Sequence, residues 1–287
     1  MDNDRLHDAS GNWLYFVGNA TVLLRYAGFS LLTDPNFIHR GESVPLGYGL
    51  STERLTDPAM EIEDLPPLDA VILSHYHGDH FDRVAEEELD HELPILTTPE
   101  AARTLDEKGF SRTLGLETWT SHELHGDEGT LRVTALPARH APAGLSVALP
   151  DVMGSCLEFW RADQPTSGEP ELRLYITGDT IMYEGIEEIG LRLPPLDLAL
   201  LHLGGTRVMG VTVTLDAEQG LELLRTIRPD LAVPIHYNDY EAFKSPLEDF
   251  AEVVRQAGFG EKVAYVRHGQ SLALPPRTPA RLGGQAS

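Results

Sequence analysis

The sequence predicts a mixed α/β fold, with β-rich segments in both halves of the chain and helices at the periphery. Short runs of β-branched, aromatic and aliphatic residues recur along the chain, and Gly, Pro, Asn and Asp bound them, as is typical of strands. Helix-start signals stand between several of these runs. No linker divides the 287 residues, and this length allows a sizeable core. We therefore expect one domain over residues 1–272 and a disordered tail, rich in Pro, Gly and Arg, over residues 273–287.

The expected strands are apolar runs that end in turn-forming residues. They cover residues 13–17, 20–26, 29–33, 69–74, 130–136, 155–161, 171–177, 196–202, 231–235 and 262–267. Between the third and the fourth of them, residues 36–67 show no clear periodicity and are expected to form a long loop. A loop of that length in a compact domain is usually functional or partly disordered.

Three helices are expected from their start signals. Thr98 and Pro99 supply an N-cap and a proline at the first helical position. Capping-box patterns stand at residues 216–219 and 245–248, and Gly258 suits the position just after the second of these helices. These helices lie between or beside the predicted strands, which is the arrangement of a mixed α/β domain.

The charge balance argues against anionic partners. Acidic residues outnumber basic ones 45 to 22, so the formal net charge is −23. Such a chain gains nothing from the release of counterions by a polyanion, and long-range repulsion slows its encounter with nucleic acid or an anionic membrane. We therefore expect neither nucleic acid nor a membrane as a partner.

The chain also lacks the usual signals for export. Residues 1–10 are polar, without the apolar core of a signal peptide, and no apolar run approaches the roughly 20 residues that span a bilayer. The single cysteine, Cys156, excludes an internal disulfide framework. A cytoplasmic location is the resulting expectation.

The segment SHYHGDHFD, residues 74–82, carries the chemistry of the chain. It places His75, His77, Asp79 and His80 directly after an apolar strand, where loops present functional side chains. The spacing of the first two histidines directs both imidazoles to one side of an extended segment, and Gly78 permits a sharp turn before the other two ligands. One loop could thus supply two neighbouring metals.

Three further ligand-type residues follow predicted strands. His140, Asp179 and His236 each come after an apolar run and before a turn. A single histidine in this context is more often a structural hydrogen-bonding residue. Together with the loop at residues 74–82, the three give the number of ligands that two metals need.

At this point the sequence resembles the metallo-β-lactamase superfamily, over about residues 12–270. The His-x-His-x-Asp-His motif, with His140, Asp179 and His236 following in that order, carries the resemblance, and Asp34 matches the early aspartate of that superfamily. Residues 31–35, 175–180 and 234–239 further resemble the branch that contains ascorbate-6-phosphate lactonase and N-acylphosphatidylethanolamine-hydrolysing phospholipase D. The resemblance implies an αββα sandwich of two mixed β-sheets flanked by helices.

The resemblance also implies a ligand set. His75, His77 and His140 would bind a first metal, Asp79, His80 and His236 a second, and Asp179 would bridge the two. Asp34 would orient the ligand loop by hydrogen bonding, although an Asp-Pro turn explains it about as well. With N and O donors only, two zinc ions are the expected cofactors, and manganese, iron or cobalt also suit such a site.

These features predict a hydrolase that uses a hydroxide bound between two metals to cleave a small ester, lactone or amide. A phosphodiesterase, directed at phospholipids or nucleotides, is the alternative, although no cluster of Lys and Arg suggests a phosphate site. A diiron redox protein is a third reading, but it would need a flavin-binding domain for which the chain has no room. The substrate in each case is a small molecule. The oligomeric state stays open, with a homo-oligomer such as a dimer common among soluble enzymes.

Several other residues are candidates for lining the pocket. Asp79 is a candidate for proton transfer, and His202, at a strand end, is either a donor to the transition state or a structural hydrogen-bonding residue. Arg139 either pairs with an anionic substrate group or forms a surface ion pair. The histidines at 122 and 125 are expected in a polar connector. Further candidates for contact with substrate are Tyr183, Tyr237, Asn238 and, in the long early loop, His39, Arg40 and Tyr48.

Overall fold

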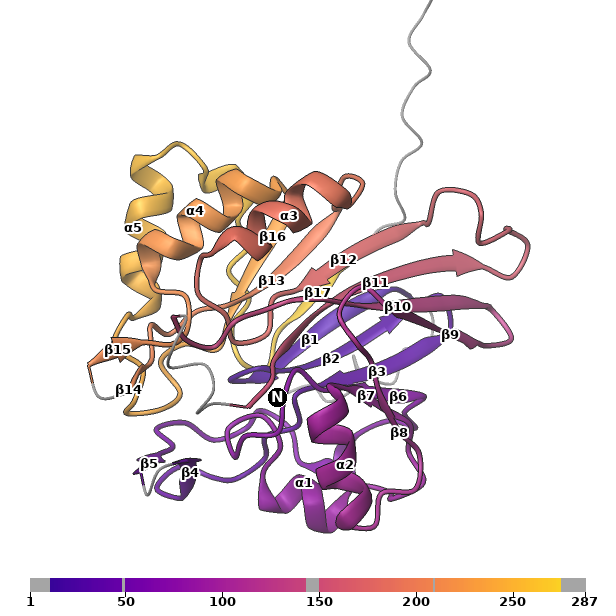
Figure 1. Cartoon of the computed structure of the whole chain (residues 1–287), viewed down its shortest axis with the longest axis horizontal. Helices are drawn as coiled ribbons and strands as arrows, with labels where there is room; N and C mark the ends of the chain where they lie inside the picture. Colours follow the sequence, from indigo (N-terminus) through magenta and orange to yellow (C-terminus); the bar gives the residue numbers. More distant parts are fainter. Residues whose placement is uncertain (1–10, 48–49, 143–149, 209, 275–287) are drawn as a thin grey trace, which may run out of the picture.

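Two β-sheets form the centre of the protein, whose computed structural model describes residues 11–47, 50–142, 150–208 and 210–274 (Figure 1). The first sheet contains, in spatial order, β17 (Ser271–Ala273), β1 (Trp13–Gly18), β2 (Thr21–Tyr26), β3 (Phe29–Thr33), β6 (Ala70–Ile72), β7 (Ile95–Thr97) and β8 (Thr113–Gly115). The second contains β16 (Leu231–Ile235), β13 (Leu198–His202), β12 (Leu172–Ile176), β11 (Met153–Arg161), β10 (Gly129–Pro137) and β9 (Ser121–His125). Both sheets combine parallel and antiparallel pairs.

The remaining elements are five α-helices, two small hairpins and two short 3₁₀ helices within the described residues. The helices are α1 (Arg83–Glu88), α2 (Pro99–Glu107), α3 (Glu184–Arg192), α4 (Ala217–Ile227) and α5 (Leu247–Gln256). The hairpins are β4 (Ser43–Gly47) with β5 (Leu50–Glu53) and β14 (Arg207–Val208) with β15 (Val211–Thr212), and the 3₁₀ helices are η2 (Ile62–Asp64) and η4 (Gly260–Lys262).

Successive side chains of a strand point to opposite faces of the first sheet, and each face packs against a different layer. Leu14 and Phe16 of β1 belong to the cluster that joins the two sheets. Tyr15 and Val17, which point to the other face, belong to the cluster that includes residues of α1 and α2. Helices α3, α4 and α5 cover the second sheet (Figure 1). The predicted αββα sandwich of two mixed sheets flanked by helices is confirmed.

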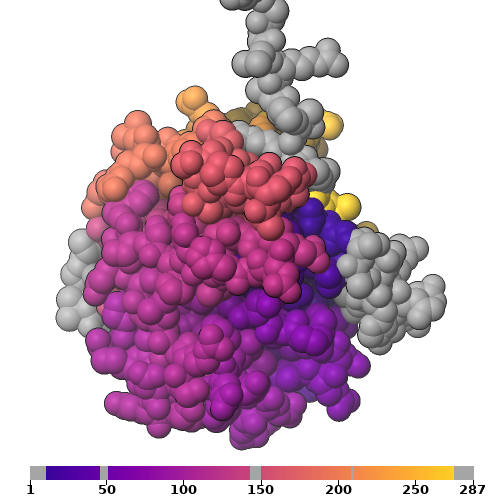
Figure 2. Space-filling model, turned by 90° about the vertical axis from the view of Figure 1, so that its right-hand side faces the viewer, coloured from indigo at the N-terminus to yellow at the C-terminus, as the bar shows by residue number. Residues whose placement is uncertain are grey.

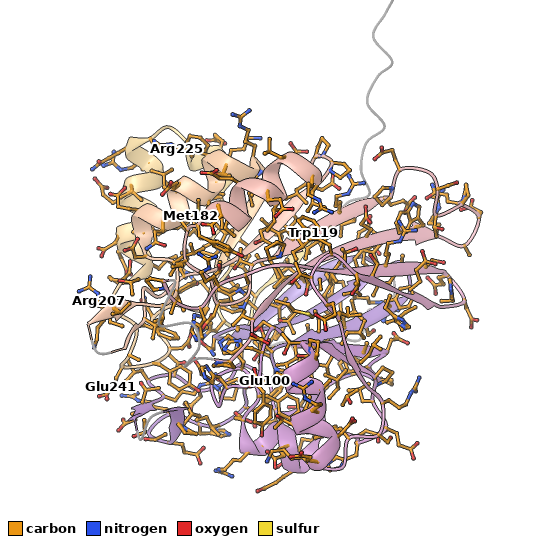
Figure 3. The ribbon with its side chains drawn as sticks, viewed as in Figure 1. Glu100, Trp119, Met182, Arg207, Arg225 and Glu241 are labelled. Carbon is orange, nitrogen blue, oxygen red and sulfur yellow. The ribbon has the colours of Figure 1, made fainter. Side chains whose placement is uncertain are left out.

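The layers follow the order of the chain for the most part, with the exception of β17, which returns from the C-terminal end to the first sheet. In Figure 2 the earlier, indigo to magenta half of the chain forms the lower part of the face and the later half forms the upper part. Figure 3 shows side chains filling the space between the layers, with Glu100 on α2 at one side and Arg225 on α4 at the other.

Four local predictions need correction. Residues 36–67 contain the β4–β5 hairpin and η2. Residues 262–267 are not a strand, because only Val263 pairs with Ala232, and the chain turns at Gly269 to pair instead with β1. Residues 121–125 are strand β9 and not a connector. The pattern at 245–248 is not a capping box: α5 begins after Pro246 without a side-chain cap.

The N-cap residues of the other two helices are confirmed, although Gln219 does not complete a capping box because its Oε1 accepts from the amide of Met182. Cys156 is buried. Thr98 caps α2 by accepting from the amide of Ala101. Asp216 caps α4 by accepting from the amide of Gln219. The expected tail lies outside the described residues from residue 275 onward.

The carboxyl ends of several strands meet at one edge of the sandwich. β12, β13 and β16 run parallel to one another, and β10 has the same direction because both β10 and β12 are antiparallel to β11. The loop after β6 reaches the same edge, where the amide of Met153 donates to the carbonyl of Ser74 over 3.0 Å. This topology brings loops from distant parts of the chain together.

Gly178 holds one of these loops close to its neighbours. Its φ of +60° lies in the left-handed region, where a side chain costs about 1–2 kcal/mol. An added Cβ would also lie 2.7 Å from the carbonyl oxygen of Met153 and 3.2 Å from the Cβ of Ser74. The backbone at Gly178 thus sets the path of the chain into Asp179.

We predict that Gly178→Ala destabilises the protein more than Gly258→Ala does. Gly258 also has a positive φ, of +77°, but its added Cβ would meet nothing within 4 Å. Gly258→Ala should therefore cost only the backbone strain, about 1–2 kcal/mol, and Gly178→Ala a further cost of about 1–3 kcal/mol from overpacking. Urea denaturation of the two variants measures the difference, and equal losses would show that the close approach at Gly178 does not matter.

Candidate metal centre

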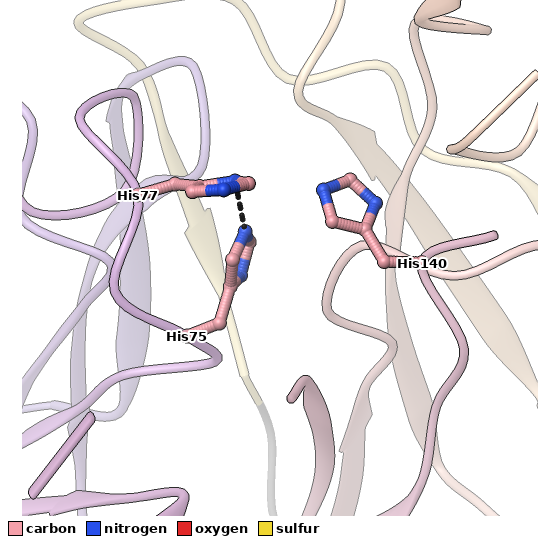
Figure 4. A group of neighbouring side chains, drawn as sticks. All are labelled: His75, His77 and His140. Atoms are coloured by element: carbon pink, nitrogen blue, oxygen red, sulfur yellow. Dashed lines mark hydrogen bonds between the residues drawn. The ribbon is translucent and has the colours of Figure 1, made fainter. Parts of the chain in front are cut away.

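Three histidines form a first ligand group, His75, His77 and His140. Each offers one ring nitrogen, and these nitrogens lie within 4.8 Å of one another. His75 and His77 come from the loop after β6, whereas His140 reaches across from the loop after β10 (Figure 4). Nε2 of His75 and Nδ1 of His77 are 3.1 Å apart, as the dashed line in Figure 4 marks.

A second ligand group contains Asp79, His80, Asp179 and His236, and all four side chains are buried. Their ligand atoms also lie within 4.8 Å of one another. Nε2 of His236 is 3.5 Å from Oδ2 of Asp79 and 3.6 Å from Oδ1 of Asp179. The loops after β6, β12 and β16 meet here.

Asp179 lies between the two ligand groups. Its Oδ2 is 3.3 Å from Nε2 of His80, in the second group, and 3.8 Å from Nε2 of His140, in the first. All seven residues that the resemblance assigns as ligands are thus brought together, with the carboxylate expected to bridge them at the centre.

Hydrogen bonds to the protein fix the outward nitrogen of several of these histidines. Nδ1 of His140 donates to the carbonyl of Val213 over 2.8 Å, and Nδ1 of His236 to the carbonyl of Leu203 over 3.1 Å. A proton held on Nδ1 leaves the lone pair on Nε2, which is the nitrogen that faces the other ligands. These carbonyls orient both imidazoles for binding at Nε2.

Asp34 orients His80 in the same way. Its Oδ2 lies 3.4 Å from Nδ1 of His80 and 3.1 Å from Nε2 of His202, and its Oδ1 accepts from the amide of Ser74 over 2.7 Å. His202 is buried, and its Nδ1 lies 3.2 Å from the hydroxyl of Thr177. Both ring nitrogens of His202 therefore have partners in the protein, and the structure places this residue behind His80.

The electrostatics differ between the groups. Burial, followed by the neighbouring histidines His80 and His77, lowers the pKa of His75 well below its ordinary value. Burial also lowers the pKa of His77 to about 4, against the opposing effect of Asp79. These imidazoles are therefore neutral at pH 7, which is the form that binds metals.

In the second group the carboxylates dominate. Burial alone would lower the pKa of His80, but Asp179, Asp79 and Asp34 outweigh it and raise that pKa. Burial would raise the pKa of Asp79, but His80 and His236 hold it at about 2. The two carboxylates of this group therefore need compensating positive charge, which protonated imidazoles or a bound cation can supply.

The donor atoms fit a divalent metal. Oδ1 of Asp79, Oδ1 of Asp179, Nε2 of His80 and Nε2 of His236 are buried without a hydrogen-bond partner. Buried polar atoms without partners are rare in proteins and point to a missing ion or water. A set of imidazole nitrogens and carboxylate oxygens suits zinc and other first-row divalent metals.

Comparison with known proteins decides the family. The sequence model described as the beta-lactamase superfamily domain matches residues 31–237. The chain belongs to this superfamily. As predicted, it is a metal-dependent hydrolase of the metallo-β-lactamase fold.

Relatives and solved structures agree with this assignment. A protein named N-acyl-phosphatidylethanolamine-hydrolyzing phospholipase D 1, from Caenorhabditis elegans, is 26% identical over 83% of this chain and 67% of its own length. A metal-dependent hydrolase from Archaeoglobus fulgidus is 28% identical over 71% of this chain and 80% of its own. The fold is shared with the isothiocyanate hydrolase from Delia radicum gut bacteria, with a TM-score of 0.75, 24% identity and coverage of 92% and 100% of the two chains. No helix among the described residues of this superfamily member is long and apolar enough to cross a membrane.

Three other candidate residues, Tyr237, Arg139 and Tyr183, make contacts with the protein itself. Tyr237 is buried in the main core cluster, where its hydroxyl donates to the carbonyl of Val266 over 3.4 Å. The guanidinium of Arg139 stacks on the ring of Tyr183, 4.1 Å from its centroid, and pairs with Glu184 over 2.9 Å. Of the two roles considered for Arg139, the structure of this β-lactamase superfamily member contains the surface ion pair.

The early loop is held by its own contacts. His39 lies 3.4 Å from Asp57 and 3.3 Å from Glu61, and the amide of Arg40 donates to Asp57 over 3.0 Å. Tyr48 lies outside the described residues. The Oδ1 of Asn238 accepts from the amide of Leu247 over 3.3 Å, at the start of α5.

The sequence did not reveal three buried residues behind the ligand loops. Asn19 donates to the carbonyl of Asp79 over 2.6 Å, and Asn36 donates to the carbonyl of Gly78 over 3.2 Å. Arg54, which is fully buried, donates to the side chain of Asn36 over 2.6 Å. The only signals were the turn at residues 18–19 and an arginine within a loop, and neither indicates contact with a metal loop.

We predict that Asp34→Asn weakens metal binding by the group that contains His80. The amide would lose the charge that holds the proton on Nδ1 of His80, and loss of such a partner typically lowers metal affinity by about 10- to 100-fold. Competition with a chromophoric chelator for Zn²⁺ measures the affinity. Asp163→Asn, which removes the same charge from an exposed side chain, is the control, and equal affinities in the two variants would contradict the role of Asp34.

Proposed function

We propose that the chain is a dinuclear metal-dependent hydrolase that cleaves a small ester, lactone or amide. His75, His77 and His140 would hold one ion, Asp79, His80 and His236 the other, and Asp179 would contact both. When bound, such ions lower the pKa of water toward 7 and polarise the group under attack. Zinc is the expected metal.

The observation that supports this proposal is the convergence of seven ligand-type side chains on one edge of the sandwich. They come from four loops, and four of their atoms are buried without hydrogen-bond partners. Keeping Asp79 and Asp179 together in a buried site is costly without cations. A site built only for stability would pair each carboxylate with an arginine or a lysine, and no such pair involves these two carboxylates among the described residues.

The residues of the chain would position the reactants and hold protons. Neutral His75 and His77 present lone pairs, and the backbone carbonyls of Val213 and Leu203 keep His140 and His236 in the binding tautomer. Burial of these side chains limits access of bulk water to the site, which strengthens every electrostatic interaction inside it. Asp79 has a pKa of about 2, so it is a poor proton donor at neutral pH, and its main role would be that of a ligand.

A cavity beside His140 is suited to a small molecule. Its volume is about 300 Å³, and its lining combines apolar side chains, among them Pro99, Leu116 and Met153, with the carboxylates of Glu117 and Asp151. This is the lower end of the range for ligand pockets. The cation that lines it in the described residues, Arg139, already pairs with Glu184. This lining favours an uncharged ester, lactone or amide over a phosphate.

A phosphodiesterase remains the second candidate because of one comparison. The relative from C. elegans is named as a phospholipase D that hydrolyses N-acyl-phosphatidylethanolamine, and it aligns over 83% of this chain. The same metal centre would suit a phosphodiester, since metals stabilise charge on a phosphoryl oxygen as well as on a carbonyl oxygen. Small molecules are the expected substrates in both cases.

Substrate panels separate these candidates. We expect the zinc-loaded protein to hydrolyse p-nitrophenyl acetate or simple lactones, with bis-p-nitrophenyl phosphate turned over more slowly, because the described lining of the cavity offers no free cation for a phosphate. The measurement is kcat/KM for each substrate under the same conditions. Turnover of the phosphodiester alone would reject the leading proposal and establish the second candidate.

Removal of one ligand from each group tests the site itself. We expect His77→Ala and Asp179→Ala to lower kcat/KM by more than about 100-fold, because the charge that develops in the transition state would lose its stabilisation. Elemental analysis should show less bound metal in both variants. His125→Ala, on the exposed end of β9, is the control, and full activity with unchanged metal content in either ligand variant would refute the assignment.

A further inference from the structure

Asn19 connects two ligands of the second ligand group, Asp79 and His236. It lies in the turn between β1 and β2, and its side chain is fully buried. Its Nδ2 donates to the backbone carbonyl of Asp79 over 2.6 Å, while its own backbone carbonyl accepts from the amide of His236 over 2.7 Å. One residue thus contacts the backbone of two ligands that lie far apart in the sequence.

The orientation of this side chain follows from its neighbours. Nδ2 faces the carbonyl oxygen of Asp79 and, at 3.5 Å, Oδ1 of Asn36. Both are acceptors, so only the amino end of the amide satisfies them. A residue with no donor at this position would leave the carbonyl of Asp79 without this bond.

The backbone conformation at Asn19 is equally specific. Its φ is +53°, in the left-handed region, where asparagine and glycine are tolerated best. This conformation allows the backbone amide to donate to Oδ2 of Asp239 over 3.1 Å while the backbone carbonyl accepts from His236. The turn therefore sets the position of the chain around His236.

A buried network supports the Asp79 side of this contact. Nη1 of Arg54 donates to Oδ1 of Asn36 over 2.6 Å, and the hydroxyl of Tyr240 donates to the same oxygen over 2.9 Å. Nδ2 of Asn36 in turn donates to the carbonyl of Gly78, the residue before Asp79. The backbone of the ligand loop is thus held at two successive carbonyls.

Two histidines of the first ligand group are oriented independently of Asn19. His140 is held by the carbonyl of Val213, and Nδ1 of His75 lies 3.0 Å from the hydroxyl of Ser74. The hydrogen bonds of Asn19 in the described structure reach Asp79, His236, Asp239 and Asn36, and none reaches a histidine of the first group. Loss of its side chain should therefore affect one metal site and spare the other.

We propose that Asn19 is a positioning residue that sets the affinity of the second metal site, the one formed by Asp79, His80 and His236, without contributing to the first. The inference rests on the proposed dinuclear function. Its Nδ2 fixes the loop of Asp79 against the loop of His236, so that their ligand atoms keep the separation seen in the structure, 3.5 Å between Oδ2 of Asp79 and Nε2 of His236.

Two variants, Asn19→Gly and Asn19→Asp, test the proposal. Glycine and aspartate both adopt a positive φ more readily than most residues, and neither has the Nδ2 donor of asparagine. Asn19→Gly deletes the side chain, and Asn19→Asp replaces the amino group with an oxygen that repels the carbonyl of Asp79. The apo proteins are titrated with Zn²⁺ in competition with a chromophoric chelator, which reports stoichiometry and both affinities. Wild-type protein should bind two zinc ions, and each variant should bind one of them about 10- to 100-fold more weakly, with the affinity for the other unchanged.

The matched control is Ala27→Gly, in the turn between β2 and β3, where φ is also positive, at +49°. It should leave both affinities unchanged. Equal weakening of both sites by the Asn19 variants, or no weakening, would overturn the inference. Should Asn19→Gly fail to fold, Asn19→Asp, which differs from the wild type by one group, decides the outcome. Wild-type protein that binds fewer than two zinc ions would instead overturn the proposed function, and this inference would fall with it.

Discussion

The burial of Asp79 and Asp179 in one cluster is the constraint on which the rest of the structure depends. Two carboxylates removed from water repel each other and are stable only beside compensating positive charge. The protein surrounds them with His80, His140 and His236, at distances of 3.3 to 3.8 Å. The pKa values of His80 and His236 are raised by these carboxylates. Since protons on these two imidazoles compete with metal ions for the same atoms, metal binding would replace protons as the source of positive charge. The fold must therefore hold seven side chains from four loops in one place.

The topology meets this requirement at the edge of the sandwich. The strands that precede His140, Asp179 and His236, and the strand that ends at His202, all point their carboxyl ends the same way. Functional loops are commonly presented at such an edge. Backbone carbonyls and Asp34 then hold the rings from behind. The left-handed backbone conformations of Asn19 and Gly178 set the path of the chain around His236 and into Asp179. Strand direction provides the coarse placement, and hydrogen bonds to backbone atoms provide the fine one.

Much of this arrangement could be predicted from the sequence. The motif at residues 74–82 and the strand ends before His140, Asp179 and His236 named every residue of the two ligand groups, because ligand chemistry and apolar strands are both visible in residue types. Asn19, Asn36 and Arg54 could not be found in this way. Asn19 and Asn36 contact backbone carbonyls that are distant in the sequence, and any loop has such carbonyls, whereas Arg54 acts through the side chain of Asn36. The strand expected at residues 262–267 failed because pairing depends on which neighbour lies beside an edge, and the chain pairs with β1 only after Gly269.

The position of the metals tests the central claim most directly. Anomalous diffraction at the zinc edge, from crystals of the protein loaded with Zn²⁺, locates the ions independently of any activity. Two peaks should appear, one against His75, His77 and His140 and the other against Asp79, His80 and His236, with Asp179 contacting both. A single peak, or peaks away from these side chains, would contradict the account of a dinuclear centre at this edge of the sandwich.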